Sequence, residues 1–81
     1  MTLLDQIRAV SAAYGEARKL KPGRVSTLIF GDGGKLPNIM SGEADLTTAR
    51  FEKSMQWLSD NWPEYTEWPV DVPRPEPARA S

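Results

Sequence analysis

The 81-residue chain contains no cysteine and no histidine. These two absences exclude disulfide bonds, thiolate nucleophiles, imidazole bases and the usual zinc ligands. The chain also lacks a recognisable secretory signal and any apolar run of about 18 residues, which favours a protein of the cytoplasm. A domain of this length buries only about 60% of its unfolded surface, so a large enclosed active site is not expected. We therefore expect no enzymatic activity, no metal and no cofactor.

Charge is nearly balanced over the whole chain but is unevenly distributed along it. The formal net charge is −1. Residues 18–41 hold five basic residues against Asp32 alone, a local balance of +4, whereas residues 60–77 hold five acidic residues against Arg74 alone, a balance of −4. Such an asymmetry can orient a protein on a polyanion with its acidic end facing away. The alternative is an ordinary solvated surface that carries these charges without a partner.

Hydrophobic spacing predicts a first helix at the N-terminus, with Thr2 as its N-cap and Asp5 in its first turn. Its apolar face consists of Leu3, Ile7, Val10, Tyr14 and Ala17, which recur at helical intervals. Pro22 disfavours helix at the residue before it and Gly23 can take a positive φ, so we expect the helix to end there. A loop rich in cations should follow.

The next stretch, "VSTLIFG", is ambiguous because its residues suit a strand by propensity and a helix by spacing. No second strand-like run exists for it to pair with, and an isolated strand would leave its backbone groups without partners. We therefore predict a short helix that starts at Arg24 or Ser26 and ends at Gly31.

The stretch "FGDGGKLPNIMSG" predicts a tight turn followed by a third, short helix. Asp32 can accept a hydrogen bond from the amide of Gly34 or Lys35, and Pro37 suits the first turn of a helix because amides there lack intrahelical partners. The expected apolar face consists of Leu36, Ile39 and Met40, and Gly42 is expected to end the helix.

A fourth helix and a proline-rich tail complete the chain. Thr47 or Thr48 is the expected N-cap, and Pro63 is expected to stop the helix. The helix should bury Phe51, Met55, Leu58 and Trp62. Beyond it, the frequent prolines predict an extended or irregular tail over residues 63–81, whose aromatic part can pack and whose residues 74–81 should be disordered. The predicted organisation is a helical domain of residues 1–62 followed by this tail.

Two short helices joined by a glycine-bearing turn have the sequence form of a helix-turn-helix. The stretch "LIFGDGGKLPNIMSGEADLTTARFEKSMQWL" resembles the DNA-binding domain of phage repressor and Cro type regulators. Leu36, Ile39 and Gly42 match two apolar positions and the closing glycine of that family, and Leu28 and Ile29 match the apolar pair of its scaffold helix. The resemblance covers about residues 25–58, and the chain departs from it by a turn about one residue shorter.

This resemblance implies an all-α fold, a small four-helix helix-turn-helix domain, with a recognition helix at about residues 33–41. It also implies a sequence-specific transcription regulator that binds double-stranded DNA as a homodimer in a bacterial or phage-infected cell. Lysine and asparagine can donate to base edges in the major groove, and glycines allow close backbone approach to phosphate. The candidate DNA-binding residues are Lys35, Asn38 and Ser41 for base edges, Gly33 and Gly34 for close approach, and Lys21, Arg24, Ser26, Thr27 and Arg50 for phosphates.

A second hypothesis is a helical protein-interaction module. In that case Trp57, Trp62, Trp68 and the acidic tail would bind a transcription factor or polymerase subunit. Tryptophans on and after a helix also commonly form core or stack on nucleic acid. The location of the positive charge and the exposure of the tryptophans discriminate between these hypotheses.

Overall fold

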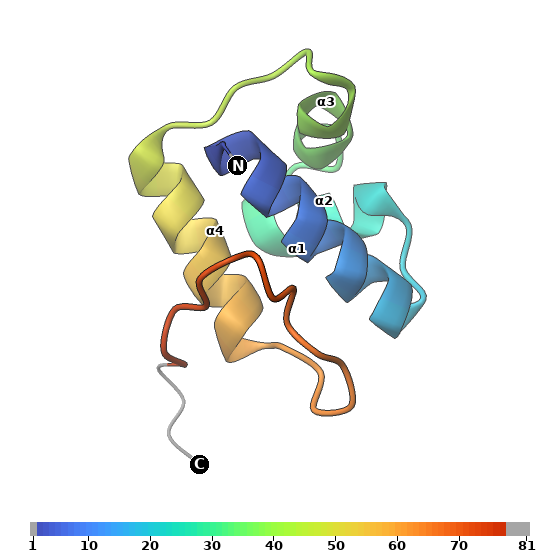
Figure 1. Cartoon of the computed structure of the whole chain (residues 1–81). Coiled ribbons are helices and arrows are strands. Elements are labelled where there is room, and N and C mark those ends of the chain that lie inside the picture. The colour runs from blue at the N-terminus through green and yellow to red at the C-terminus, as the bar shows by residue number, and fades with distance from the viewer. Residues whose placement is uncertain (1, 78–81) are drawn as a thin grey trace.

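The computed structural model of the chain describes residues 2–77, which form four helices and no strand. The helices are α1 (Leu3–Arg18), α2 (Pro22–Phe30), α3 (Lys35–Ser41) and α4 (Thr48–Asp60). In Figure 1, α1 crosses in front of α2, with α4 on one side and α3 on the other. None of the helices among residues 2–77 is long and apolar enough to cross a membrane. The predicted all-α class is confirmed.

The N-terminus of α1 is capped as predicted. The Asp5 amide donates to the Thr2 hydroxyl (3.1 Å), and the Thr2 amide donates to the Asp5 carboxylate (3.2 Å). These reciprocal bonds satisfy amides that have no partner inside the helix. Because the bond from the Thr2 amide favours the ionised carboxylate, it lowers the pKa of Asp5.

The link between α1 and α2 differs from the prediction. α1 ends at Arg18 and is followed by its C-cap Lys19, whose φ of 58° is left-handed, and α2 begins at Pro22, earlier than expected. Proline fits the first position of a helix because the amide it lacks would have no intrahelical partner there. Gly23 lies inside α2 and has no positive φ. As a result, Lys21 is the N-cap of α2 and Arg24 lies in its first turn instead of in a loop.

The turn between α2 and α3 agrees with the prediction at its main points. Gly31 ends α2 with a φ of 72°, and Gly42 ends α3 with a φ of 85°. Pro37 lies in the first turn of α3. Asp32 accepts a hydrogen bond from the Gly34 amide (2.9 Å), although the N-cap position itself is Gly34.

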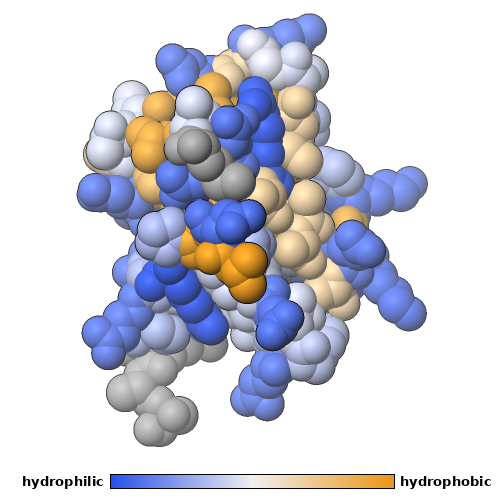
Figure 2. Space-filling view, in the orientation of Figure 1, coloured by the Kyte–Doolittle hydropathy of each residue, from blue (hydrophilic) through white to orange (hydrophobic). Residues whose placement is uncertain are grey.

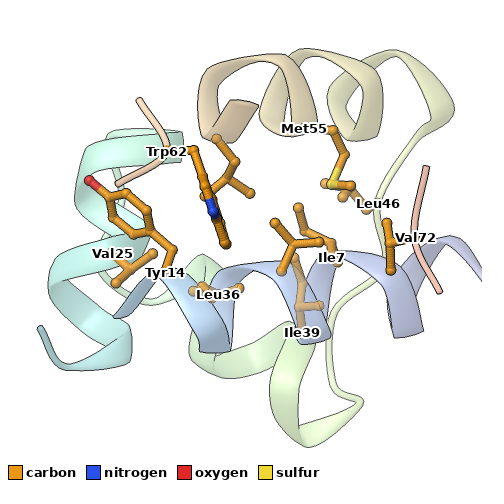
Figure 3. Packing of buried hydrophobic residues seen from close by; sticks show 11 residues of the cluster. Ile7, Tyr14, Val25, Leu36, Ile39, Leu46, Met55, Trp62 and Val72 are labelled. Carbon is orange, nitrogen blue, oxygen red and sulfur yellow. The ribbon is translucent and has the colours of Figure 1, made fainter. Parts of the chain in front are cut away.

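One hydrophobic core joins all four helices (Figure 3). Its buried residues are Ile7, Val10, Tyr14, Val25, Leu36, Ile39, Leu46, Met55, Leu58, Trp62 and Val72. Most of the predicted apolar faces are therefore confirmed. Leu3, Leu28 and Met40 are exceptions, because 37%, 36% and 38% of their surfaces are exposed.

The described part of the proline-rich tail packs on the helices. Val72 is buried in the core, and the Trp62 and Trp68 ring centres are 4.7 Å apart. The tail then runs along α4, where the Ser59 hydroxyl donates to the Pro75 carbonyl (Figure 1). The predicted disorder is wrong for residues 74–76, which make hydrogen bonds with α4. Residues 78–81 lie outside the described residues.

Candidate functional site

Ser26 connects α2, the turn and α3. Its side chain is fully buried, and its hydroxyl donates to the Asp32 carbonyl while accepting a hydrogen bond from the Leu36 amide (2.8 Å). The Leu36 amide belongs to the first turn of α3, where helical amides have no internal partner. The predicted phosphate contact of Ser26 is therefore wrong, because its side chain has no access to solvent. Its role is to fix the orientation of α3 relative to α2.

The turn before α3 presents bare backbone at the surface. Gly33 and Gly34 are exposed, and neither has a positive φ. A Cβ on Gly34 would meet only the Asp32 carboxylate, at an ordinary contact distance of 3.5 Å. A Cβ on Gly33 would lie 3.6 Å from the Gly23 carbonyl, so the turn folds back against the start of α2. Glycine at position 34 is thus not required by the local geometry.

The solvent face of α3 carries two of the predicted base-contacting residues. Asn38 and Ser41 are exposed, whereas Leu36 and Ile39 on the same helix are buried. The Ser41 hydroxyl donates to the Asn38 carbonyl (3.1 Å). Within residues 2–77, the Asn38 side-chain amide makes no hydrogen bond. Its donors and its acceptor are therefore available to a partner.

Lys35 and Arg50 line one surface hollow of about 360 Å³, together with Asp45, Leu46 and Thr47. The Lys35 ammonium donates to the Asp45 carbonyl (3.0 Å), which turns this side chain toward the link between α3 and α4. Arg50 is exposed and lies 5.8 Å from the centre of the Phe30 ring. In the described part of the chain, neither cation has a carboxylate within 4.0 Å. The hollow thus combines two unpaired cations with one nearby acid.

The remaining candidates lie on α2. Lys21, Arg24 and Thr27 are all exposed, and the Thr27 hydroxyl donates to the Gly23 carbonyl (3.0 Å). Because Gly33 packs against Gly23, the start of α2 lies beside the turn that leads into α3. The part of α2 that carries Lys21 and Arg24 therefore lies near this turn, although Arg24 and Gly33 are nine positions apart in the sequence.

The three tryptophans are engaged inside the fold. Trp62 is buried, and its indole N–H donates to the Thr66 carbonyl (2.7 Å). Half-buried Trp68 donates to the Val72 carbonyl (2.9 Å), and half-buried Trp57 packs edge-on against Tyr14 with ring centres 5.6 Å apart. This arrangement leaves no exposed tryptophan cluster of the kind that the interaction-module hypothesis invokes.

Sequence reasoning gave Arg8 no role, but the structure does. The Arg8 guanidinium donates through Nε to the Ile39 carbonyl (2.9 Å) and through Nη1 to the Asp5 carboxylate (3.3 Å). The first bond ties α1 to the last turn of α3, where carbonyls lack intrahelical partners. No spacing rule could have found it, because the two residues are 31 positions apart.

Among residues 2–77, no three acidic side chains gather as a metal-binding group would. Comparison with known proteins gave no match: the chain fits no protein-family model, and no curated protein and no solved structure is significantly similar to it.

Proposed function

We propose that the chain is a sequence-specific regulator of transcription that binds double-stranded DNA. In this proposal α2, the turn and α3 act as a helix-turn-helix, with the turn and α3 (about residues 33–41) entering the major groove. The observation that carries the proposal is the surface around α3. There, within residues 2–77, the Asn38 side-chain amide makes no hydrogen bond, and cations without ion-pair partners lie beside the exposed glycine turn.

The positions of the side chains divide the roles within this surface. Asn38 reads a base edge, since an asparagine amide pairs bidentately with adenine, and Ser41 is the second base contact. Lys35 is held toward the link to α4, so we assign it with Arg50 to phosphate contacts. Lys21, Arg24 and Thr27 contact phosphates from the start of α2.

The glycines of the turn support the same proposal. Gly33 and Gly34 lack the positive φ that makes glycine necessary at Gly31 and Gly42. Because the fold does not demand glycine at position 34, close approach of an external backbone gives a reason for it. At Gly33 and Gly34 themselves a phosphate chain would meet bare backbone, with the Asp32 carboxylate beside it.

We further propose that the active form on DNA contains two copies. One small helix-turn-helix reads too few base pairs for high affinity, and paired half-sites supply the rest. The acidic residues of the tail would face away from the DNA, which disfavours binding in the wrong orientation. The cell compartment under this proposal is the cytoplasm of a bacterial or phage-infected cell.

A salt titration of binding to random-sequence duplex DNA tests the proposal. We expect log affinity to fall linearly with log salt concentration, because phosphate contacts release counterions. Lys35→Ala should weaken binding and reduce the magnitude of the slope by about 1. Asn38→Ala should leave the slope unchanged and cost about 1–3 kcal/mol only on a selected operator.

The matched control is Lys53→Ala, which removes the same charge from α4 outside the hollow of Lys35 and should leave the slope unchanged. The protein is kept at nanomolar concentration so that it does not associate with itself during these measurements. If the folded protein does not bind duplex DNA at low salt, the proposal is wrong.

Gly34→Ala separates stability from binding. We expect the free energy of unfolding to stay constant or to rise by about 0.4–1 kcal/mol, because alanine restricts the unfolded chain and its Cβ fits the turn. Affinity for DNA should nevertheless fall, because the new methyl group stands where the phosphate backbone approaches. Urea unfolding and the DNA titration, performed on one preparation, measure both effects. Unchanged DNA affinity would remove the turn from the interface.

A further inference from the structure

A second hollow lies between α2 and α4, and Arg50 borders both this hollow and the one that contains Lys35. It has a volume of about 390 Å³ and is lined by Ile29, Phe30, Arg50, Lys53, Ser54 and Trp57. Its aromatic residues are half-buried, and its two cations are exposed. Within residues 2–77 no carboxylate comes within 4.0 Å of Lys53. The hollow therefore offers an aromatic floor with positive charge at its rim, which suits an apolar side chain flanked by carboxylates.

The tail of the same protein presents such a group. Val70 is 89% exposed at the tip of a turn that is closed by a hydrogen bond from the Val72 amide to the Pro69 carbonyl (3.1 Å). The turn is attached to the core, because Val72 is buried and its carbonyl accepts a hydrogen bond from the Trp68 indole N–H. A single exposed valine is ordinary on a protein surface. Here the valine stands on a turn that is attached to the core, and its side chain is exposed to solvent.

Two acidic residues lie close to this valine in the sequence. Asp71 follows it directly and Glu67 stands three residues before it, and both are exposed. Where the C-terminal segment crosses the face shown in Figure 1, Figure 2 shows a hydrophobic spot beside hydrophilic side chains. We call Glu67, Val70 and Asp71 the acidic knob. Its charges are opposite to those of the hollow, and its apolar centre matches the aromatic floor.

The hollow and the tail segment that follows the knob lie on different sides of α4. The hollow uses Arg50, Lys53, Ser54 and Trp57, whereas residues 73–75 of the tail border a separate hollow together with Phe51, Glu52, Met55 and Gln56. At 100° per residue, these two sets lie on opposite faces of the helix. One copy can therefore offer its knob to one neighbour while its hollow receives the knob of another.

We propose that the acidic knob of one copy inserts into the hollow between α2 and α4 of a second copy. The contact joins two different surfaces, so it is heterologous and can repeat beyond a dimer. It is also small, which places it among weak and transient interfaces. This proposal does not rest on DNA binding, and it assigns a function to the exposed valine and to Lys53 that the DNA surface does not use.

Sedimentation equilibrium from about 10 µM to 1 mM protein tests the proposal, a range that covers weak affinities. We expect the weight-average mass to rise with concentration and to pass that of a dimer. Raising the salt concentration from about 0.1 M to 1 M shortens the Debye length from about 10 Å to 3 Å and should weaken the association. A wild-type protein that stays monomeric at 1 mM and low salt would overturn the proposal.

Two variants identify the surfaces. Val70→Asp disables the knob and Lys53→Glu reverses the charge of the hollow, and each should lower the association constant at least about 10-fold. Mixed in equal amounts, they should form a one-to-one dimer and nothing larger. The reason is that Lys53→Glu keeps an intact knob and Val70→Asp keeps an intact hollow. If the wild type associates but the mixture does not, the head-to-tail contact is refuted.

Controls separate this result from misfolding and from net charge. Lys53→Arg should retain association, and Lys21→Glu makes the same charge change as Lys53→Glu at an exposed position outside the hollow. Far-UV circular dichroism and urea unfolding establish that each variant is folded. Equal loss of association in Lys21→Glu would refute the specific contact and leave only a general charge effect.

Discussion

Replacement of Ser26 by alanine is expected to reduce the free energy of unfolding by about 2–4 kcal/mol. The hydroxyl is fully buried and makes two hydrogen bonds, to the Asp32 carbonyl and from the Leu36 amide. Removing one partner from a buried polar group costs about 1–3 kcal/mol, because the remaining group loses its hydrogen bond without regaining water. Urea unfolding monitored by tryptophan fluorescence measures the change.

Ser11→Ala is the matched control. Ser11 is as buried as Ser26, but its hydroxyl donates to the Ile7 carbonyl one turn earlier in its own helix. That carbonyl already belongs to the backbone ladder of α1, so no partner is left unsatisfied, and alanine is the better helix former. We expect a change within about 0.5 kcal/mol. Equal effects of the two substitutions would show that Ser26 does not hold α3 in place.

Val72→Asp is expected to lower the free energy of unfolding by about 2–4 kcal/mol. Burial of a valine side chain contributes about 1.5–3 kcal/mol, and a carboxylate at the same place lacks a hydrogen-bond partner. The protein can avoid burying this carboxylate only if the tail leaves the core. In that case the native state buries less surface, and the denaturant slope of unfolding falls together with the stability.

Two further variants serve as controls for the Val72→Asp experiment on the tail. Val70→Asp changes an exposed valine in the same turn, so its stability should stay within about 0.5 kcal/mol of wild type. A chain shortened to residues 1–67 removes Trp68 and Val72 together, and it should lose at least as much stability as Val72→Asp. Wild-type stability in both Val72→Asp and the shortened chain would contradict the packing of the tail.

Local sequence rules were sufficient for the helices. The spacing of Ile7, Val10 and Tyr14 follows from the geometry of one helix face, and Gly31 and Gly42 end helices because their φ values are positive. Pro22 shows the limit of such rules. Proline suits both the position after a helix and the first position of the next one, and only the left-handed conformation of Lys19 decides between them.

The long-range contacts could not be predicted from the sequence. Ser26 had the right chemistry for a phosphate contact, and nothing in its neighbourhood indicated that its hydroxyl would bond to a residue ten positions away. The prediction of disorder failed at residues 74–76 because the prolines of this segment disfavour regular structure but do not prevent packing on a neighbouring helix. The backbone of this segment instead uses α4 side chains, such as Ser59 and Gln56, as hydrogen-bond donors.

The attachment of α3 has a thermodynamic consequence for any partner that binds it. Its first turn is bonded to Ser26 and its last turn to Arg8, so a helix of seven residues, too short to persist alone, is ordered before binding. A partner therefore meets a surface whose conformational entropy has already been lost during folding. The heat-capacity change of binding should then reflect the interface alone, without the additional change that accompanies folding coupled to binding.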